Sequence, residues 1–378
     1  MSRWAWAEVD ASAIEHNVRA LRAAVAPAAL WAVVKANGYG HGSVVAARAA
    51  LAGGADGLCV ALVQEGVVLR EAGIEAPIMV LSQQPPEQVA EAVRHGLQLT
   101  VYSQAGIEAI AAAGGVNHPV HLKIDTGMRR VGAQLDEVAS FAAHVEESSA
   151  THLVGVFTHL AVADEPDNPF TAQQLKRFDD VVASLRVHGV QPGLVHAANS
   201  AGAIAHPAAR YGMVRVGIAI YGISPGHGVD AQVAALGLRP ALSLHARVGH
   251  VKRVRAGERI SYGLRHTFTH DTTVATVPLG YADGVPRRLH AVSGAVLIGG
   301  VRRPIVGVVT MDQLMVDCGD TPVAVGDEVV LIGEQTSEKG SERIAAADWA
   351  DALDTIAYEV VCGISARVER RPVALPPA

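Results

Sequence analysis

Residues 31–42 read WAVVKANGYGHG, a short apolar run that passes through Lys35 into a glycine-rich loop bearing Tyr39. The apolar run is typical of a buried strand, for which residues 31–35 are the candidate. Such a strand would fix the lysine amine, and the glycines would let the backbone and the phenol approach a bulky ligand. An amine in this setting suits a Schiff base with an aldehyde cofactor. A lysine at a strand end often only extends its ammonium group to water. The choice between a solvated lysine and a cofactor-binding one therefore depends on residues elsewhere in the sequence.

Residues 11–235 alternate short apolar runs with amphipathic helical patterns, which is typical of a parallel sheet. The strand candidates are 31–35, 57–62, 77–81, 98–102, 120–124, 153–157, 194–196 and 214–218, and the clearest helices are 43–53, 86–95, 135–147 and 171–188. Eight such units in about 200 residues predict an α/β fold of the (β/α)8 barrel type. A doubly wound open sheet is the alternative, but it usually has fewer strands and needs a G-x-G-x-x-G loop, which the sequence lacks.

The alternation of strand and helix patterns ends after residue 236, where β-rich runs are separated by Gly, Pro and Asp turns. The runs are 242–249, 274–279, 295–298, 305–309 and 328–332, with one short helix expected at 343–353. Residues 236–378 are therefore predicted to form a second, mainly antiparallel β domain. The N-terminal residues 1–10 contain an extra strand that we expect to pair with this second domain.

Composition excludes several classes of function. The chain has 378 residues, enough for two domains, and a net charge of −6 without a basic cluster, so nucleic acid is not an expected partner. No apolar run approaches the roughly 18 residues of a membrane helix, and the N-terminus carries acids where a signal peptide needs apolar residues. The three cysteines are far apart, which predicts buried thiols in a reducing, cytoplasmic setting.

Polar residues fall at the ends of the predicted strands, where a barrel of this type places its chemistry. They are Lys35, Lys123, His159, His196 and Arg215, each associated with a different strand. Five such residues at five strand ends are more than scattered surface polarity would give, so we expect one shared site.

The last two barrel strands supply features that suit a phosphate group. Asn199 and Ser200 open a helical stretch, and Gly217-Ile218 can present backbone N–H groups without an obstructing side chain. Barrel enzymes often bind phosphate at this place. An aldehyde cofactor with a phosphate group and a lysine partner is pyridoxal 5′-phosphate.

Arg215 then indicates the type of reaction. Most enzymes that use this cofactor place a carboxylate against the pyridine nitrogen and keep it protonated, but arginine does not give up its proton in a protein. If Arg215 faces the nitrogen, a carbanion at the substrate is stabilised only briefly, which favours racemisation over transamination. Racemisation needs an acid or base on each face, for which Lys35 and Tyr262, in Ser261-Tyr262-Gly263, are the candidates.

Nine ordered segments carry a family resemblance along essentially the whole chain. They are AVVKANGYGHG (32–42), KIDTGMRRVG (123–132), FTHLAVAD (157–164), HAANSAGAI (196–204), VRVGIAIYGISP (214–225), SYGLRHTF (261–268), PLGYADGVPR (278–287), TMDQLMVD (310–317) and AYEVVCGIS (357–365). The chain resembles the alanine racemase family, bacterial fold-type III enzymes that use pyridoxal phosphate. The resemblance implies a homodimer with shared active sites and the supply of D-alanine for peptidoglycan.

The resemblance also implies roles for individual residues. Lys35 resembles the cofactor-binding lysine that acts on D-alanine, and Tyr262 the tyrosine that acts on L-alanine across the dimer interface. Arg215 resembles the partner of the pyridine nitrogen, with His159 holding it. The phosphate shell corresponds to Tyr39, Ser200, Gly217, Ile218 and Tyr358.

Three further matches concern the substrate. Arg130 matches the arginine that meets the substrate carboxylate, although Arg129 stands where a glycine is common, so which arginine points inward is open and spacing favours Arg130. Met311, beside Asp312, matches a loop that enters the neighbouring subunit's site. Lys123 occupies a position that is carbamylated in some members, where the carbamate would orient Arg130.

Other functions remain as alternatives. They are a serine or broad-specificity racemase, a decarboxylase of similar architecture, and a non-catalytic barrel that binds the cofactor. A carboxylate against the ring nitrogen would favour the decarboxylase, and the second domain with Tyr262 weighs against the non-catalytic barrel. His266 and His270 have a spacing that could hold a metal on a helix, but their context is β or loop, so no metal site is expected.

Overall fold

The computed structural model describes residues 3–338 and 340–374. Contacts divide these residues into two compact units. One unit comprises residues 12–239, and the other combines residues 3–11 with residues 240–374.

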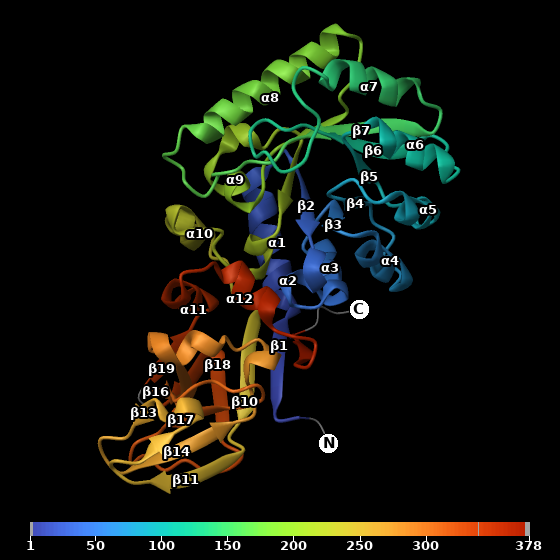
Figure 1. The fold of residues 1–378 in the computed structure, drawn as a ribbon. Coiled ribbons are helices and arrows are strands. Elements are labelled where there is room, and N and C mark those ends of the chain that lie inside the picture. Colours follow the sequence, from blue (N-terminus) through green and yellow to red (C-terminus); the bar gives the residue numbers. More distant parts are fainter. Residues whose placement is uncertain (1–2, 339, 375–378) are drawn as a thin grey trace. The chain divides into compact units, whose positions relative to one another are not determined.

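Residues 12–239, all of them described, form a parallel eight-stranded sheet (Figure 1). The strands are β2 (Ala29–Val33), β3 (Gly57–Val60), β4 (Ile78–Val80), β5 (Leu99–Val101), β6 (His118–Lys123), β7 (Thr151–Phe157), β8 (Leu194–His196) and β9 (Met213–Val216). Their order is β4-β3-β2-β9-β8-β7-β6-β5. The two end strands meet, because Val80 N–H donates to the carbonyl of Gln98 at 2.9 Å and Gln98 N–H donates to that of Ile78 at 2.8 Å. The predicted (β/α)8 barrel is confirmed.

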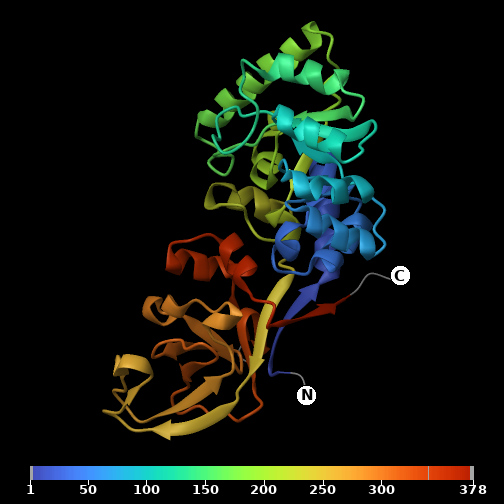
Figure 2. The ribbon, with the colours of Figure 1, turned by 45° about the vertical axis from the view of Figure 1, so that its right-hand side comes forward.

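The helices of this unit alternate with its strands along the chain, and α3 to α8 lie outside the sheet (Figures 1 and 2). They are α1 (Ala11–Val25), α2 (Lys35–Tyr39), α3 (Ser43–Ala52), α4 (Val63–Glu71), α5 (Pro86–Arg94), α6 (Gln104–Ala112), α7 (Val138–Glu147), α8 (Phe170–Val187), α9 (Ser200–Ala205) and α10 (Asp230–Ala235). In α8 the spacing of Leu175, Phe178, Val182 and Leu185 places all four side chains in the buried interface. Strands β3 and β4 are buried and apolar on both sides, as expected for a sheet covered by helices.

Among the described residues of the other unit, ten strands form a sheet in which β1 and β20 are parallel and the remaining neighbours antiparallel. Its order is β11-β14-β17-β16-β15-β18-β10-β1-β20, with β19 paired to β18. The strands are β1 (Ala5–Asp10), β10 (Leu242–Arg247), β11 (His250–Val254), β14 (Thr272–Val277), β15 (Ala295–Ile298), β16 (Val301–Val306), β17 (Leu314–Asp317), β18 (Glu328–Ser337), β19 (Gly340–Ile344) and β20 (Glu369–Val373), and a separate hairpin joins β12 (Arg259–Ile260) to β13 (His266–Thr267). The predicted, mainly antiparallel β architecture is confirmed.

Several predicted boundaries in this unit are wrong. The run expected at 305–309 overlaps only the end of β16, which spans Val301–Val306, so residues 307–309 lie outside the strand. The helix expected at 343–353 begins only at Ala346 as α11 (Ala346–Leu353), because β19 extends to Ile344. A second helix, α12 (Ala357–Gly363), was not expected. Strands β11 and β20 were also missed, because charged side chains interrupt their apolar pattern.

Within the described ranges, none of the helices combines the length and the hydropathy that a membrane span requires. Cys59, Cys318 and Cys362, all in the described ranges, form no disulfide. Cys59 and Cys318 are buried as predicted, whereas Cys362 is exposed, so the prediction of a buried thiol is wrong at that position.

Candidate active site

Lys35 lies at the start of an unusual turn and not, as predicted, at the end of a strand. Strand β2 ends at Val33, and the residues from Ala36 to Tyr39 have φ angles of 51°, 54°, 62° and 51°. This is one turn of left-handed helix, which costs roughly 1–2 kcal/mol for each residue that is not glycine. Hydrogen bonds such as that from Gly38 N–H to the carbonyl of Val34, at 2.9 Å, close the turn. The turn fixes the backbone at both Lys35 and Tyr39.

Neighbouring side chains hold this turn in place. Glu65, at the start of α4, accepts a hydrogen bond from Ala36 N–H at 2.6 Å. Asn37 accepts one from Ser43 N–H at 3.0 Å. The buried His41 ring contacts the carbonyl oxygen of Tyr39 through Nδ1 at 2.9 Å. Sequence reasoning missed the roles of Glu65 and His41, because neither stands at a strand end.

Arg215, on β9, is buried and bound by neutral acceptors. Its Nη2 donates to the carbonyl oxygens of Thr158 and Ala197 at 2.9 and 3.0 Å, and its Nη1 lies 2.7 Å from Nδ1 of His196. The guanidinium lies over the ring of Phe157, 5.0 Å from its centroid. We expected His159 to hold this arginine, but the imidazole that contacts it is that of His196, which ends the neighbouring strand β8.

A chain of buried imidazoles continues from Arg215. Arginine has no acceptor, so Nδ1 of His196 must accept the hydrogen bond, and the His196 proton then lies on Nε2. That proton points to Nδ1 of His121 at 3.1 Å, and Nε2 of His121 can donate to Oε1 of Gln98 at 2.8 Å. Burial and the charge of Arg215 lower the pKa of His121 to about 3 and place that of His196 well below its usual value. Both rings are therefore neutral. The hydrogen bonds all donate in the same direction, from Arg215 to His196, from His196 to His121 and from His121 to Gln98.

The charge at this point thus resides on the guanidinium. Burial lowers the pKa of Arg215 to about 10, which still leaves it protonated near neutral pH. Sequence reasoning missed His121 and Gln98, because an isolated histidine in the middle of a strand looks like an ordinary core residue.

Four residues expected to bind phosphate come together at the ends of β8 and β9. Gly217 N–H donates to the hydroxyl of Ser200 at 2.9 Å, and a Cβ at Gly217 would lie 2.5 Å from the hydroxyl of Tyr39. Only glycine fits under this phenol. Ile218 follows in the same buried turn. Asn199 has a local role as the N-cap of α9, because its side chain accepts from Gly202 N–H at 2.9 Å.

Lys123, Arg130 and His159 are grouped around one narrow hollow beside the ends of β6 and β7, which as it stands has no room for a water molecule. Burial is the largest cause that lowers the pKa of Lys123 to about 8, and the charges of Arg215, Arg130 and Lys35 act in the same direction. Burial and these cations also place the pKa of His159 well below its usual value. The cations around this hollow outnumber its one carboxylate, Asp125, and would favour an anion beside them.

The choice between two neighbouring arginines follows from the same hollow. Arg130 lines it, whereas Arg129 is not among its lining residues. Arg129 has a φ of 59°, the left-handed region that glycine adopts at no steric cost. This conformation explains why a glycine suits that position, and it supports Arg130 as the arginine directed to the site.

Three expected site residues belong to the C-terminal unit. Tyr262 and Met311 are exposed, with 73% and 52% of their surface accessible, and Tyr358 is half-buried. Tyr262 is flanked by Ser261 and Gly263, with φ angles of 65° and 74°. The hydroxyl of Ser261 donates to the carbonyl of Val308 at 2.8 Å and anchors the start of this turn.

The fit around Gly217 generates a prediction for cofactor binding. If the site takes the pyridoxal phosphate expected from the sequence, Gly217→Ala should weaken its binding by about 10- to 100-fold, because the added methyl group forces apart the phenol and the backbone at a cost of roughly 1–3 kcal/mol. Titration of the apoprotein with the cofactor, followed by absorbance, measures the change. The same substitution should cost less in a Tyr39→Phe background, which lacks the hydroxyl that it meets. An equal loss in both backgrounds would show that the steric explanation is wrong.

Comparisons with known proteins cover both units. The family model "Alanine racemase, N-terminal domain" matches residues 9–225, and "Alanine racemase, C-terminal domain" matches residues 241–372. The alanine racemase of Symbiobacterium thermophilum is 50% identical over 369 residues, covering 97% of this chain and 96% of the relative. That of Thermobifida fusca is 45% identical over 377 residues, covering 98% of each.

Solved structures give the same picture. The crystal structure of alanine racemase from Bacillus anthracis with bound L-Ala-P matches with a TM-score of 0.92 at 39% identity, covering 99% of this chain and 96% of that one. The alanine racemase from Streptomyces coelicolor A3(2) matches with a TM-score of 0.89 at 41% identity, covering 98% of each chain.

Proposed function

This chain belongs to the alanine racemase family of isomerases, and we propose that it interconverts L- and D-alanine by a two-base mechanism with pyridoxal 5′-phosphate as cofactor. The observation that carries the proposal is the buried Arg215, whose acceptors are two carbonyl oxygens and a neutral imidazole. A guanidinium held in this way can only donate a hydrogen bond to a ring nitrogen, which leaves that nitrogen unprotonated.

The residues present fit the cofactor. Gly217, the Tyr39 phenol and the Ser200 hydroxyl form a cradle that a Cβ at Gly217 would fill, and we assign this cradle and Ile218 to the phosphate. The assignment of Tyr358 to the phosphate stays a prediction from the family resemblance. When bound, pyridoxal phosphate supplies an aldehyde that captures the substrate amine and delocalises the negative charge left at the α-carbon. Lys35, fixed by the left-handed turn, provides the amine that holds the cofactor.

Two residues move the proton in this proposal. Lys35, once released by the substrate, removes the α-proton from D-alanine or returns it on the same face. Tyr262 of the partner subunit acts on the opposite face, on L-alanine, so the active unit is a homodimer with shared sites. Arg130 and the loop at Met311 orient the substrate carboxylate, and His159 lies beside Arg130 in the same hollow. D-Alanine produced in this way in the cytoplasm would enter peptidoglycan.

The direct test is incubation of the purified, cofactor-loaded protein with L-alanine, followed by chiral analysis of the product. D-Alanine should accumulate until the two enantiomers are equal, with L-serine turned over more slowly. Faster turnover of serine would favour the serine or broad-specificity racemase. Release of carbon dioxide from ornithine, lysine or diaminopimelate would contradict the assignment of Arg215.

The role of Lys35 has a spectroscopic consequence. Lys35→Ala should abolish racemisation and remove the visible absorbance of lysine-bound pyridoxal phosphate, because the amine that attaches the cofactor is gone. Lys176→Ala, which removes an exposed lysine on α8, should leave both properties intact. A visible band that persists in the Lys35 variant would show that another lysine holds the cofactor.

The role of Tyr262 is best tested by isotope effects. Tyr262→Phe should lower kcat by roughly 10²- to 10⁴-fold, the usual contribution of a positioned proton-transfer group. Two enantiomers have equal free energy, so kcat/KM must fall equally in both directions and does not identify the faces. The α-deuterium isotope effect should therefore rise more with L-alanine than with D-alanine. Equal isotope effects for the two enantiomers would contradict the two-base assignment.

Lys123 is proposed to be carbamylated, which would place an anion beside Arg130. Carbamylation requires the neutral amine, and a pKa of about 8 makes this form more abundant than it is for an exposed lysine. With ¹³C-bicarbonate, a carbamate signal should be present in NMR spectra near pH 8, decline as the pH falls and the amine is protonated, and disappear in Lys123→Gln. Loss of the same signal in Lys176→Gln, or its persistence in Lys123→Gln, would place the modification elsewhere.

A further inference from the structure

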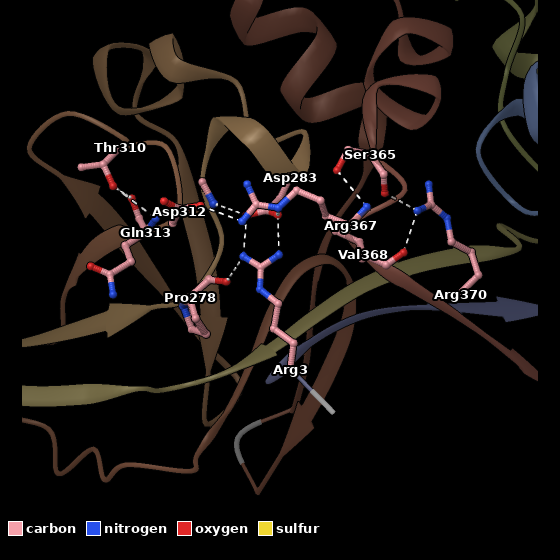
Figure 3. A network of polar contacts seen from close by, with 11 residues as sticks. Arg3, Pro278, Asp283, Thr310, Asp312, Gln313, Ser365, Arg367, Val368 and Arg370 are labelled. Atoms are coloured by element: carbon pink, nitrogen blue, oxygen red, sulfur yellow. Dashed lines mark hydrogen bonds and ion pairs between the residues drawn. The ribbon is translucent and has the colours of Figure 1, made fainter. Parts of the chain in front are cut away.

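A buried carboxylate in the C-terminal unit, that of Asp283, gathers distant parts of the chain (Figure 3). Its side chain is fully buried, and both oxygens are bound by the guanidinium of Arg3, at 2.5 and 2.7 Å. Arg3 also donates to the carbonyl of Pro278 at 2.8 Å, and Gly280 N–H donates to the carboxylate at 2.9 Å. Burial alone would raise the pKa of Asp283, but the bonds from Arg3 and Gly280 outweigh it and lower the pKa, so the group is an anion.

A second arginine connects this carboxylate to a surface loop. Arg367 places Nε 3.3 Å from Oδ1 of Asp283 and Nη2 2.6 Å from Oδ1 of Asp312 (Figure 3). Asp312 is partly exposed and directly follows Met311. One guanidinium therefore joins a buried anchor to the loop that carries Met311.

The backbone of the same loop is bound to the short helix that contains Asp283. Tyr281 N–H donates to the carbonyl of Thr310, and Ala282 N–H donates to that of Met311, both at 3.0 Å. A Cβ at Gly280 would lie 2.3 Å from the carbonyl oxygen of Thr310, so the two segments are as close as backbones allow. A shift of the Asp283 helix would thus be passed directly to Met311.

The loop also adjoins the anchor of Tyr262. The hydroxyl of Ser261 is bound to the carbonyl of Val308, and a Cβ at Gly307 would lie 2.6 Å from the Cβ of Ser261. Val308 is three residues from Met311 in the chain. The turn that carries Tyr262 is therefore anchored directly to the segment 307–311, which ends at Met311.

We propose that Asp283, Arg3 and Arg367 are positioning residues that fix Met311 and Tyr262 for racemisation. The inference rests on the proposed function, in which these two side chains serve the site of the neighbouring subunit. Arginine and carboxylate groups that pair through two parallel hydrogen bonds constrain orientation as well as distance. A buried ion pair is weak evidence for stability in itself, whereas a displacement of about 1 Å at a reacting group can cost roughly 100-fold in rate.

The sharpest variant is Arg367→Met, because Arg3 still neutralises Asp283 and the fold should persist. We expect kcat for alanine to fall by roughly 10- to 100-fold, with cofactor content and the thermal unfolding midpoint close to those of the wild type. The α-deuterium isotope effect should rise more with L-alanine than with D-alanine, because Tyr262 is misplaced. Arg367→Lys should recover part of the activity, since one ammonium can still contact a carboxylate.

Two further variants keep the test decisive. Asp312→Asn, at a partly exposed side chain, should lower kcat and change the isotope effect in the same way as Arg367→Met does. Combining the two substitutions should lower kcat little further than either one alone. Arg253→Met is the matched control, because it removes an exposed pair with Asp320, at 2.7 Å, from the same unit and should leave both quantities unchanged.

The possible outcomes distinguish a failure of the proposed racemase function from a failure of the positioning role. Absence of racemisation in the wild type would overturn the proposed function itself. An active wild type, with Arg367→Met and Asp312→Asn indistinguishable from Arg253→Met, would overturn the positioning role. Equal increases of the isotope effect for both enantiomers would also overturn it, because a general loss of stability would not distinguish the two faces.

Discussion

The site depends on keeping one positive charge in place inside a barrel of apolar strands. Arg215 is bound by carbonyl oxygens and by a neutral imidazole, and the imidazole is in turn bound to a second ring and an amide. Each partner can occupy only one protonation state and one orientation, since the first donor in the chain cannot accept. The cost of burying the charge is offset by three hydrogen bonds and the face of Phe157. The rigid guanidinium is what separates this site chemically from one built around a carboxylate.

The fold could be predicted wherever local pattern and tertiary environment agree. Strands β3 and β4 are uninterrupted apolar runs between turns, and both were located to within two residues. Strand β20 was not, because it reads Glu369-Arg370-Arg371-Pro372-Val373 and is a strand only through its pairing with β1. Helix α12 was missed for the opposite reason, since its short apolar sequence suits a strand equally well.

The candidate site shows a similar division. Lys35 and Arg215 are conspicuous in sequence because a charge interrupts or follows an apolar strand. The His196–His121 contact joins residues 75 positions apart and has no local signal. The left-handed turn was expected only as a glycine-rich loop, because Ala36 and Tyr39 carry no sign of the positive φ that their surroundings impose. Sequence identified the reactive groups, and the structure was needed to find what holds them.

The pairing of β1 has a consequence for biosynthesis. This strand leaves the ribosome well before its partners β10 and β20, which begin more than 230 and 360 residues later, at Leu242 and Glu369. The whole barrel is synthesised while β1 still presents unpaired backbone groups on both edges, a template for pairing with another chain. Closing contacts over such separations is slow, since loop-closure entropy is lost before any contact forms. Nascent chains should therefore be most prone to aggregation late in translation, when the barrel has been synthesised and β1 is still unpaired.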